Sequence, residues 1–354
     1  MEAARPYFGG RRSCIIRRMR RILLGLVFFF GALFIYNYFS ELESVLEVAR
    51  QGAWQFFGLA IGAELLWLVA TGATYWAIYR AMAVERPLKP FIRIASASNF
   101  VNTVAPTGGV SSLAVLIADA KRNKYPSAYA TVAQALFVFV EYMGFTAFLI
   151  IGLLSLIRTD TLTTTEIVAA SLYWLSAIGL ASLLYLGSVS ERRLARVSRR
   201  ILSLLNRVAR PFLKRRWLDI SRADDFANKI AEGLVEVRKK PRRLLLAIAA
   251  SAANKACMLL VLLLMFYAFN VPPRANVLFA GFSLAYLFLI ISPTPAGIGI
   301  VEGILTLGLT SLAIPLSAAA LIVLGYRAIT FWLRLFIGMV LVQRSSLLSA
   351  ESSG

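Results

Sequence analysis

The apolar stretch from residue 276 to residue 314 is interrupted near its centre by two prolines and two glycines, and a carboxylate follows them. Lipid offers no hydrogen-bond partner, so each unpaired backbone group at that depth costs several kcal/mol. The interrupted backbone must therefore be buried in protein or line a wet cavity. The pattern predicts either a binding site at membrane depth or a plain turn between two helices that end at the interface. The sequence is Ser292-Pro293-Thr294-Pro295-Ala296-Gly297-Ile298-Gly299-Ile300-Val301-Glu302-Gly303.

This stretch resembles the Pro-x-Pro-Gly-Gly-x-Gly-x-x-Glu signature of the lysylphosphatidylglycerol synthase transmembrane, or flippase-like, family, with Ala296 at the position of the first Gly. The similarity continues through Gly325-Tyr326-Arg327 to Phe331-Trp332, and a looser motif runs from Asn99 to Gly109. The family usually has Glu-Arg in the helix after that looser motif, whereas this chain has Glu141 followed by Tyr142.

The similarity covers residues 20 to 343, and it implies a function as well as a fold. It implies movement of an anionic or aminoacylated phospholipid, or of a polyprenyl-phosphate-linked lipid, between the two leaflets of a membrane. Family members that transfer amino acids carry a separate soluble domain, and the resemblance here is to the membrane domain alone.

Hydrophobic residues make up 59% of the chain, which predicts an all-α polytopic membrane protein. Six apolar segments are long enough to cross a bilayer. The sequence has no His, and its two Cys residues suggest no disulfide. It also lacks a Gly-x-x-x-x-Gly-Lys phosphate-binding motif, so we expect no cofactor, no metal and no ATP hydrolysis. The six predicted spans are residues 22–40, 53–79, 129–157, 167–187, 244–269 and 317–342.

The net charge of +20 is distributed unevenly along the chain. Residues 1–21 and 188–243 are strongly basic, and the second segment holds seventeen Lys or Arg against six Asp or Glu. Cytoplasmic segments carry such an excess, so we expect both termini, including residues 344–354, in the cytoplasm and the protein in the cytoplasmic membrane. The cations lack the interleaved aromatic residues of a nucleic-acid site, so a nucleic-acid partner is not expected.

Two apolar stretches fit re-entrant hairpins better than spans. Residues 94–118 have basic flanks on both sides, and about 25 residues are too few for two crossings of roughly 20 residues each. We expect this hairpin to enter from the cytoplasmic side and to turn between Asn102 and Gly109. The opposite sidedness is expected for residues 276–314. If this stretch instead crosses the membrane once as a broken span, the C-terminus lies outside.

These segments divide the chain into two halves with the same order of elements. Residues 22–157 form the first half, residues 158–187 contribute the fourth span, and residues 244–343 form the second half. Spans and hairpins then follow in the same order with reversed orientation. This inverted repeat is an arrangement in which transporters bind substrate near the bilayer midplane.

The basic segment 188–243 contains two runs of apolar residues at helical spacing, one of which is Phe226, Ile230, Leu234 and Val237. Two amphipathic helices lying on anionic lipids of the inner leaflet would explain this pattern. A loop that is basic only because it stays in the cytoplasm explains it equally well.

Charged residues lie near the centres of several predicted spans. Glu64, Glu141 and Lys255 are central, and Arg327 and Arg334 are seven residues apart, which would place them on one face of a helix. We predict that Glu64 or Glu141 pairs with one of the three bases, because unpaired charges at that depth are costly. A purely structural network of ion pairs is the alternative to a binding site.

A helix that begins after a Pro-Gly interruption presents free N–H groups to an anion, so both interruptions and the two arginines are candidates for binding a lipid phosphate. Helix capping is the other explanation for the Asn and Thr residues among them. The predicted substrate-binding residues are Asn99, Asn102, Pro106, Thr107, Gly108, Gly109, Pro293, Thr294, Pro295, Gly297, Gly299, Glu302, Arg327 and Arg334.

Two other functions remain open. A lipid-modifying transferase would need an acidic or metal site, and Asp224-Asp225 is a weak candidate because acidic pairs in basic helices are usually solvated. A membrane adaptor would use residues 188–243 to recruit a partner, but it leaves the charges inside the spans unexplained. These patterns specify neither the lipid head group nor an oligomeric state.

Overall fold

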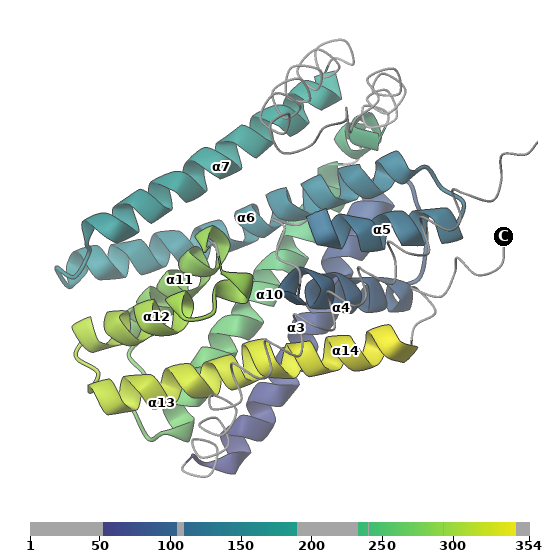
Figure 1. Cartoon of the computed structure of the whole chain (residues 1–354). Helices are drawn as coiled ribbons and strands as arrows, with labels where there is room; N and C mark the ends of the chain where they lie inside the picture. The colour runs from purple at the N-terminus through teal and green to yellow at the C-terminus, as the bar shows by residue number, and fades with distance from the viewer. Residues whose placement is uncertain (1–51, 105–109, 190–232, 240, 293, 345–354) are drawn as a thin grey trace, which may run out of the picture. The chain divides into compact units, whose positions relative to one another are not determined.

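The structure is a computed structural model that describes residues 52–104, 110–189, 233–239, 241–292 and 294–344. The chain divides into two compact units, Met1–Glu47 and Val48–Gly354, and every described residue belongs to the second unit. All regular elements in the described ranges are helices (Figure 1). The predicted all-α fold class is therefore confirmed.

Five helical segments are long and apolar enough to cross a membrane. They coincide with five of the six predicted spans, with ends that differ by a few residues. The predicted span 22–40 lies outside the described residues. The five segments are α3 (Trp54–Ala81), α6 (Ser127–Arg158), α7 (Thr164–Val189), α10 (Pro241–Ala268) and the continuous segment Leu316–Leu341.

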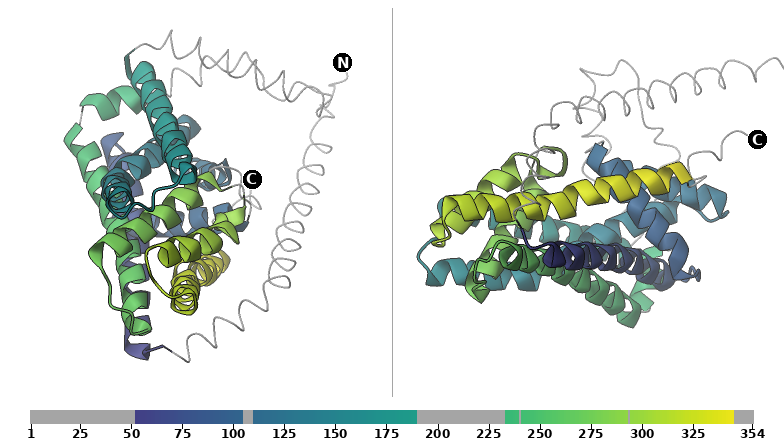
Figure 2. Two further views of the ribbon diagram at one scale, coloured as in Figure 1. Left: turned by 90° about the vertical axis from the view of Figure 1, so that its left-hand side faces the viewer. Right: turned by 90° about the horizontal axis from the view of Figure 1, so that it is seen from below.

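The segment Leu316–Leu341 combines three elements of different helical type. It contains α13 (Leu316–Arg327), the π-helix η3 (Ala328–Leu333) and most of α14 (Arg334–Arg344). Together they form one rod, which is drawn in yellow-green to yellow in Figures 1 and 2. A π-helical turn within an α-helix is rare, and the known examples are frequently located at functional sites.

The two predicted hairpins are pairs of short helices that pack against each other. The first pair is α4 (Leu88–Val104) and α5 (Val110–Arg122). The second pair is α11 (Ala275–Ile291) and α12 (Ile300–Ser311), joined through the short 3-10 helix η2 (Pro295–Gly297). Helix α4 contacts η2, so the interrupted backbone of the second pair lies against the first pair.

Packing between the halves follows a repeated scheme. Helices α3 and α10 form the most extensive contact, and they are antiparallel because the Ala53 N–H at the start of α3 donates to the Ala268 carbonyl at the end of α10 (3.0 Å). Helix α4 packs on α14, and its counterpart α11 packs on α6. The first short helix of each pair thus packs on the last long helix of the other half.

Close helix contacts are possible because small residues lie at the crossings. At Gly144 of α6, an added Cβ would lie 2.8 Å from Cβ of Ser251 on α10, well inside van der Waals contact. Only Gly therefore allows this approach of α6 to α10. The same crossing carries charged residues of both helices, as described below.

Basic residues gather where α3 ends and α10 begins. Arg243 donates to the Arg80 carbonyl oxygen (2.7 Å), and Arg86 donates to Asp119 near the end of α5 (2.6 Å). Burial and hydrogen bonding to Asp119 raise the pKa of Tyr125, whose hydroxyl donates to the same carboxylate. The end of the first hairpin is thereby fixed to the loop after α3.

The described end of the basic segment packs into the protein. Residues 233–239 are helical, and the side chains of Leu234 and Val237 are buried against the cluster that includes Val132 and Tyr79. Their predicted position against the inner leaflet is therefore wrong, because the apolar face of this helix contacts protein. The remainder of the two predicted amphipathic helices, including Asp224 and Asp225, lies outside the described residues.

Candidate functional site

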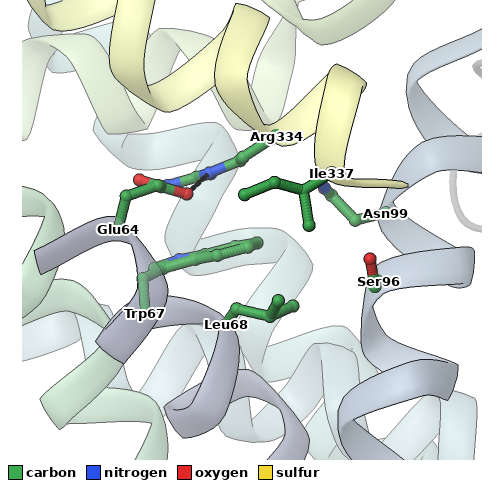
Figure 3. Close-up of a pocket in the computed structure, with 7 residues that line it drawn as sticks. All are labelled: Glu64, Trp67, Leu68, Ser96, Asn99, Arg334 and Ile337. Atoms are coloured by element: carbon green, nitrogen blue, oxygen red, sulfur yellow. Dashed lines mark hydrogen bonds and ion pairs between the residues drawn. The ribbon is translucent and has the colours of Figure 1, made fainter. Parts of the chain in front are cut away.

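Glu64 of α3 and Arg334 of α14 form an ion pair between the two halves of the chain (Figure 3). The guanidinium donates from Nε to one carboxylate oxygen and from Nη2 to the other (3.1 Å for the second bond). Glu64 is only 1% exposed, and Arg334 is mostly buried. The Trp67 ring lies under Arg334, with 3.5 Å between the guanidinium carbon and the ring centroid, so a cation–π contact adds to the pair.

Glu141 of α6 and Lys255 of α10 form a second ion pair between the halves. The Ser251 hydroxyl (2.7 Å) and the Tyr286 hydroxyl (3.1 Å) also donate to Glu141. The Lys255 ammonium group donates to the Asn254 side-chain oxygen (3.0 Å) and lies 4.5 Å from the centroid of the Tyr286 ring. The carboxylate and the ammonium group thus have several partners besides each other.

The predicted pairing of first-half acids with second-half bases is confirmed by these two contacts. Helices α3 and α10 have equivalent places in the two halves, as do α6 and α14. The pair Glu64–Arg334 joins α3 to α14, and the pair Lys255–Glu141 joins the corresponding helices α10 and α6. The two pairs have opposite polarity, because α3 carries an acid whereas α10 carries a base. Desolvating such charges is expensive, and each is tolerated at this depth because its counter-charge is in contact.

A pocket opens beside the Glu64–Arg334 pair (Figure 3). Helix α4 contributes Ser96 and Asn99 to its wall, and α14 contributes Arg334 and Ile337. Its enclosed volume is about 10 Å³, and the figure rises to about 220 Å³ when the space open to the surroundings is included. The enclosed part has room for about one water molecule, so a phosphate group enters only if side chains of the wall move apart.

The interruption between α11 and α12 has a strained backbone that a third ion pair supports. Ala296 has a φ of 49°, and Gly297 and Gly299 have φ values of 73° and 77°. Arg327 donates from Nη2 to the Ala296 carbonyl oxygen (3.0 Å) and from Nε to Glu302 (2.5 Å). Arg327 thereby satisfies a carbonyl that the helix interruption leaves without an intrahelical partner.

The two arginines of the last rod do not share one face, contrary to the prediction. Arg327 contacts Glu302 of α12, whereas Arg334 contacts Glu64 of α3. The π-helix between them explains the difference, because its i to i+5 hydrogen bonds take more residues per turn than an α-helix. Seven residues therefore do not complete two turns.

The predicted binding residues fall into separate groups. Asn99, Arg334 and Glu64 meet at the pocket, whereas Arg327, Glu302 and Gly297 lie at the η2 interruption. Asn102 accepts a hydrogen bond from Ser111 across the first hairpin (3.3 Å). The Thr294 hydroxyl donates to the Ile298 carbonyl oxygen (3.0 Å) within its own turn, and the backbone of Pro295 and Gly299 belongs to that turn. Pro106, Thr107, Gly108, Gly109 and Pro293 lie outside the described residues.

Sequence reasoning missed several residues of these networks. Trp67 and Ser96 line the pocket, and Tyr286 and Ser251 bind Glu141. Trp67 was detectable in principle, because it follows Glu64 by three residues and so lies on the same helical face. No comparable spacing connects Tyr286 or Ser251 with Glu141, because these contacts depend on how α6, α10 and α11 pack.

Comparison with known proteins bears on most of the chain. A family profile described as "Lysylphosphatidylglycerol synthase TM region" matches residues 22–338. A search of curated proteins gave no match. The profile match includes both short-helix pairs and all of the charged residues described above.

Proposed function

Because the chain belongs to the lysylphosphatidylglycerol synthase TM region family, we propose that it moves a phosphate-bearing lipid between the leaflets of the cytoplasmic membrane. The lipid is anionic, aminoacylated or linked to a polyprenyl phosphate. The observation that carries this proposal is Arg334, a buried cation that lines a pocket between both halves of a multi-pass membrane protein. The chain transports the lipid and does not modify it covalently.

The pocket residues suit a phosphate group. Arg334 supplies charge-assisted donors, and Asn99 and Ser96 supply further hydrogen-bonding groups from the opposite wall. The start of α12 is a poorer anion site, because the Glu302 carboxylate lies in its first turn and one of its buried oxygens accepts no hydrogen bond from the described residues. We therefore assign the phosphate to the pocket, and we assign Arg327 to holding the η2 interruption.

The architecture of the proposed transporter is an inverted repeat with six spans and two re-entrant hairpins. Three observations support this proposal: the repeated order of long and short helices, the reciprocal packing of α4 on α14 and α11 on α6, and the contact of α4 with η2. In such transporters, substrate binds where interrupted helices from both repeats meet. Both termini lie in the cytoplasm in this scheme.

Reconstitution in liposomes tests the proposed function. Fluorescent phospholipids placed in one leaflet should move to the other leaflet faster when the protein is present, with no new lipid species in the mass spectrum. A transferase would give a new species, and an adaptor would give neither result. Unchanged lipid movement with active, folded protein would contradict transport.

A matched pair of variants connects transport with the pocket. Arg334→Gln removes charge-assisted hydrogen bonds to the phosphate, each contributing about 1.5–3 kcal/mol, so transport should fall about tenfold to a hundredfold. Arg274→Gln removes an exposed cation in the α10–α11 loop and should have no effect. Equal transport rates for the two variants would show that Arg334 does not bind the substrate.

A further inference from the structure

The pocket is electrically balanced by a single pair of charges. Glu64 is the only carboxylate among the residues that line it, and Arg334 is the only cation. The other lining side chains are uncharged: Trp67, Leu68, Ser96, Asn99 and Ile337. A ligand that carries net charge therefore changes the balance of a site whose two charged side chains are largely buried.

Neighbouring titratable groups do not alter this balance. Cys257 of α10 and Tyr326 of α13 are within electrostatic reach of Glu64, and both are neutral at pH 7. Lys255 of α10 interacts with Arg334 but is matched by Glu141 of α6. The η3 segment that packs on α3 has no titratable residue, and α4 contributes only Ser96 and Asn99 to the pocket.

Arg334 can hold Glu64 and a phosphate at the same time. It uses Nε and one N–H of Nη2 for Glu64, and within the described residues Nη1 donates to no protein group. The end of the guanidinium, formed by Nη1 and Nη2, is therefore available for a phosphate in the two-bond geometry that arginine prefers. Glu64 need not leave when the phosphate arrives.

A phosphodiester with one negative charge would then leave a net charge of minus one in the pocket. Burying an uncompensated charge costs several kcal/mol, and buried carboxyl groups usually avoid that cost by taking up a proton. Glu64 is the group placed to do so. A proton on Oε2 of Glu64 also frees Nη2 of Arg334 from the carboxylate, so that this N–H can donate to the phosphate. Oε1 of Glu64 continues to accept from Nε of Arg334.

We propose that binding of a net-anionic phospholipid head group in this pocket is coupled to uptake of one proton from water by Glu64. This inference rests on the proposed function and adds its coupling ion. A zwitterionic head group brings its own cation, so it binds without a proton. The empty site returns to the Glu64–Arg334 pair when the lipid and the proton leave together.

Proton uptake on binding can be measured directly. Purified protein in zwitterionic nanodiscs is titrated with dihexanoylphosphatidylglycerol, which has one negative charge, in weakly buffered solution with a pH indicator. We expect about one proton taken up per lipid bound, and an affinity that falls about tenfold for each pH unit of increase. Dihexanoylphosphatidylcholine, the zwitterionic control, should take up none.

Variants identify the group that takes up the proton. Glu64→Gln should bind the anionic lipid without proton uptake and with no pH dependence, whereas Glu85→Gln, at a carboxylate 73% exposed, should behave as the wild type. Zero protons per bound lipid in the wild type, or one proton in the Glu64→Gln variant, overturns the inference.

This outcome is separable from failure of the proposed function. If labelled lipid moves between leaflets but binds without a proton, only the coupling is wrong. If no lipid moves in liposomes, transport itself is wrong, whatever the proton count. If dihexanoylphosphatidylglycerol does not bind at all, the coupling proposal fails, and the liposome assay alone decides the transport proposal.

Discussion

At the scale of single residues, the charges in the spans are held by contacts that leave few alternatives. Lys255 is 1% exposed, and Glu141 is its only anionic partner in the described part of the chain. Glu141 in turn has two hydroxyl donors that would remain without Lys255. The two residues are therefore not equally sensitive to substitution.

Glu141→Gln should destabilise the protein more than Lys255→Met does. Removing the carboxylate leaves a buried ammonium group without a counter-charge, which costs about 3–5 kcal/mol. The double variant Glu141→Gln/Lys255→Met should recover most of that loss. The unfolding free energies of the three variants are compared in mixed micelles, and Asp160→Asn, at an exposed carboxylate, serves as the control. Equal losses for the two single variants would contradict this ranking.

Ala296 occupies a backbone conformation that favours glycine. Its φ of 49° is in the left-handed region, which costs a non-glycine residue about 1–2 kcal/mol. Ala296→Gly should therefore raise the unfolding free energy by about 1 kcal/mol. Ala320→Gly, within the regular helix α13, should lower it by about 1 kcal/mol. A loss of stability in both variants would show that Ala296 is not strained.

At the scale of elements, tight helix crossings set the positions of the charged side chains. The contact between α6 and α10 at Gly144 brings Ser251 within 2.7 Å of Glu141. A larger side chain at this crossing has to separate the helices. The Glu141–Lys255 pair would then lose its geometry as well as its packing.

Gly144→Val should cost about 1–3 kcal/mol of stability, because overpacked crossings force backbone shifts. Gly179→Val on α7 is the matched control, since nothing lies within 4 Å of the position of its added Cβ. Thermal unfolding in detergent compares the two variants. If both variants have the same midpoint, the crossing is not as tight as described.

The sequence predicted elements better than it predicted contacts between them. Five spans and both short-helix pairs follow from apolar length, flanking charge and the Pro-Gly interruption. The different partners of Arg327 and Arg334 did not follow from the sequence, because no residue in Ala328–Leu333 is an evident signal for a π-helix. Burial of Leu234 and Val237 was also missed, since an amphipathic helix has the same pattern whether protein or lipid covers it.

The pocket illustrates the same limit for the candidate site. Glu64, Asn99 and Arg334 were singled out because polar residues inside apolar spans are costly, which is a property of each segment alone. Their meeting in one pocket required the packing of α4 on α3 and α14. Trp67 and Ser96 were missed because neither residue is unusual in an apolar helix.

At the scale of the whole molecule, both ends of the bundle can be located experimentally. Arg80, Arg86 and Arg243 gather at one end, and the contact of Ala53 with Ala268 marks the other end of α3 and α10. In the proposed topology the first end lies in the cytoplasm, because positive charge is in excess there. Residues in the loops at the two ends should therefore differ in accessibility.

Single cysteines introduced in a background without Cys14 and Cys257 test this orientation. Glu85→Cys and Lys124→Cys should be labelled by an impermeant reagent only after the cells are opened. Asp160→Cys and Arg274→Cys should be labelled in intact spheroplasts. Labelling of all four from one side would contradict the proposed topology.

The opposite polarity of the two ion pairs decides which halves can associate. Both acids, Glu64 and Glu141, belong to the first half, and both bases, Lys255 and Arg334, belong to the second half. Two first halves would bury only these acids and two second halves only these bases, and buried charges without a counter-charge select against the wrong partner. Each half of the chain is thus complementary to the other and unsuited to self-association.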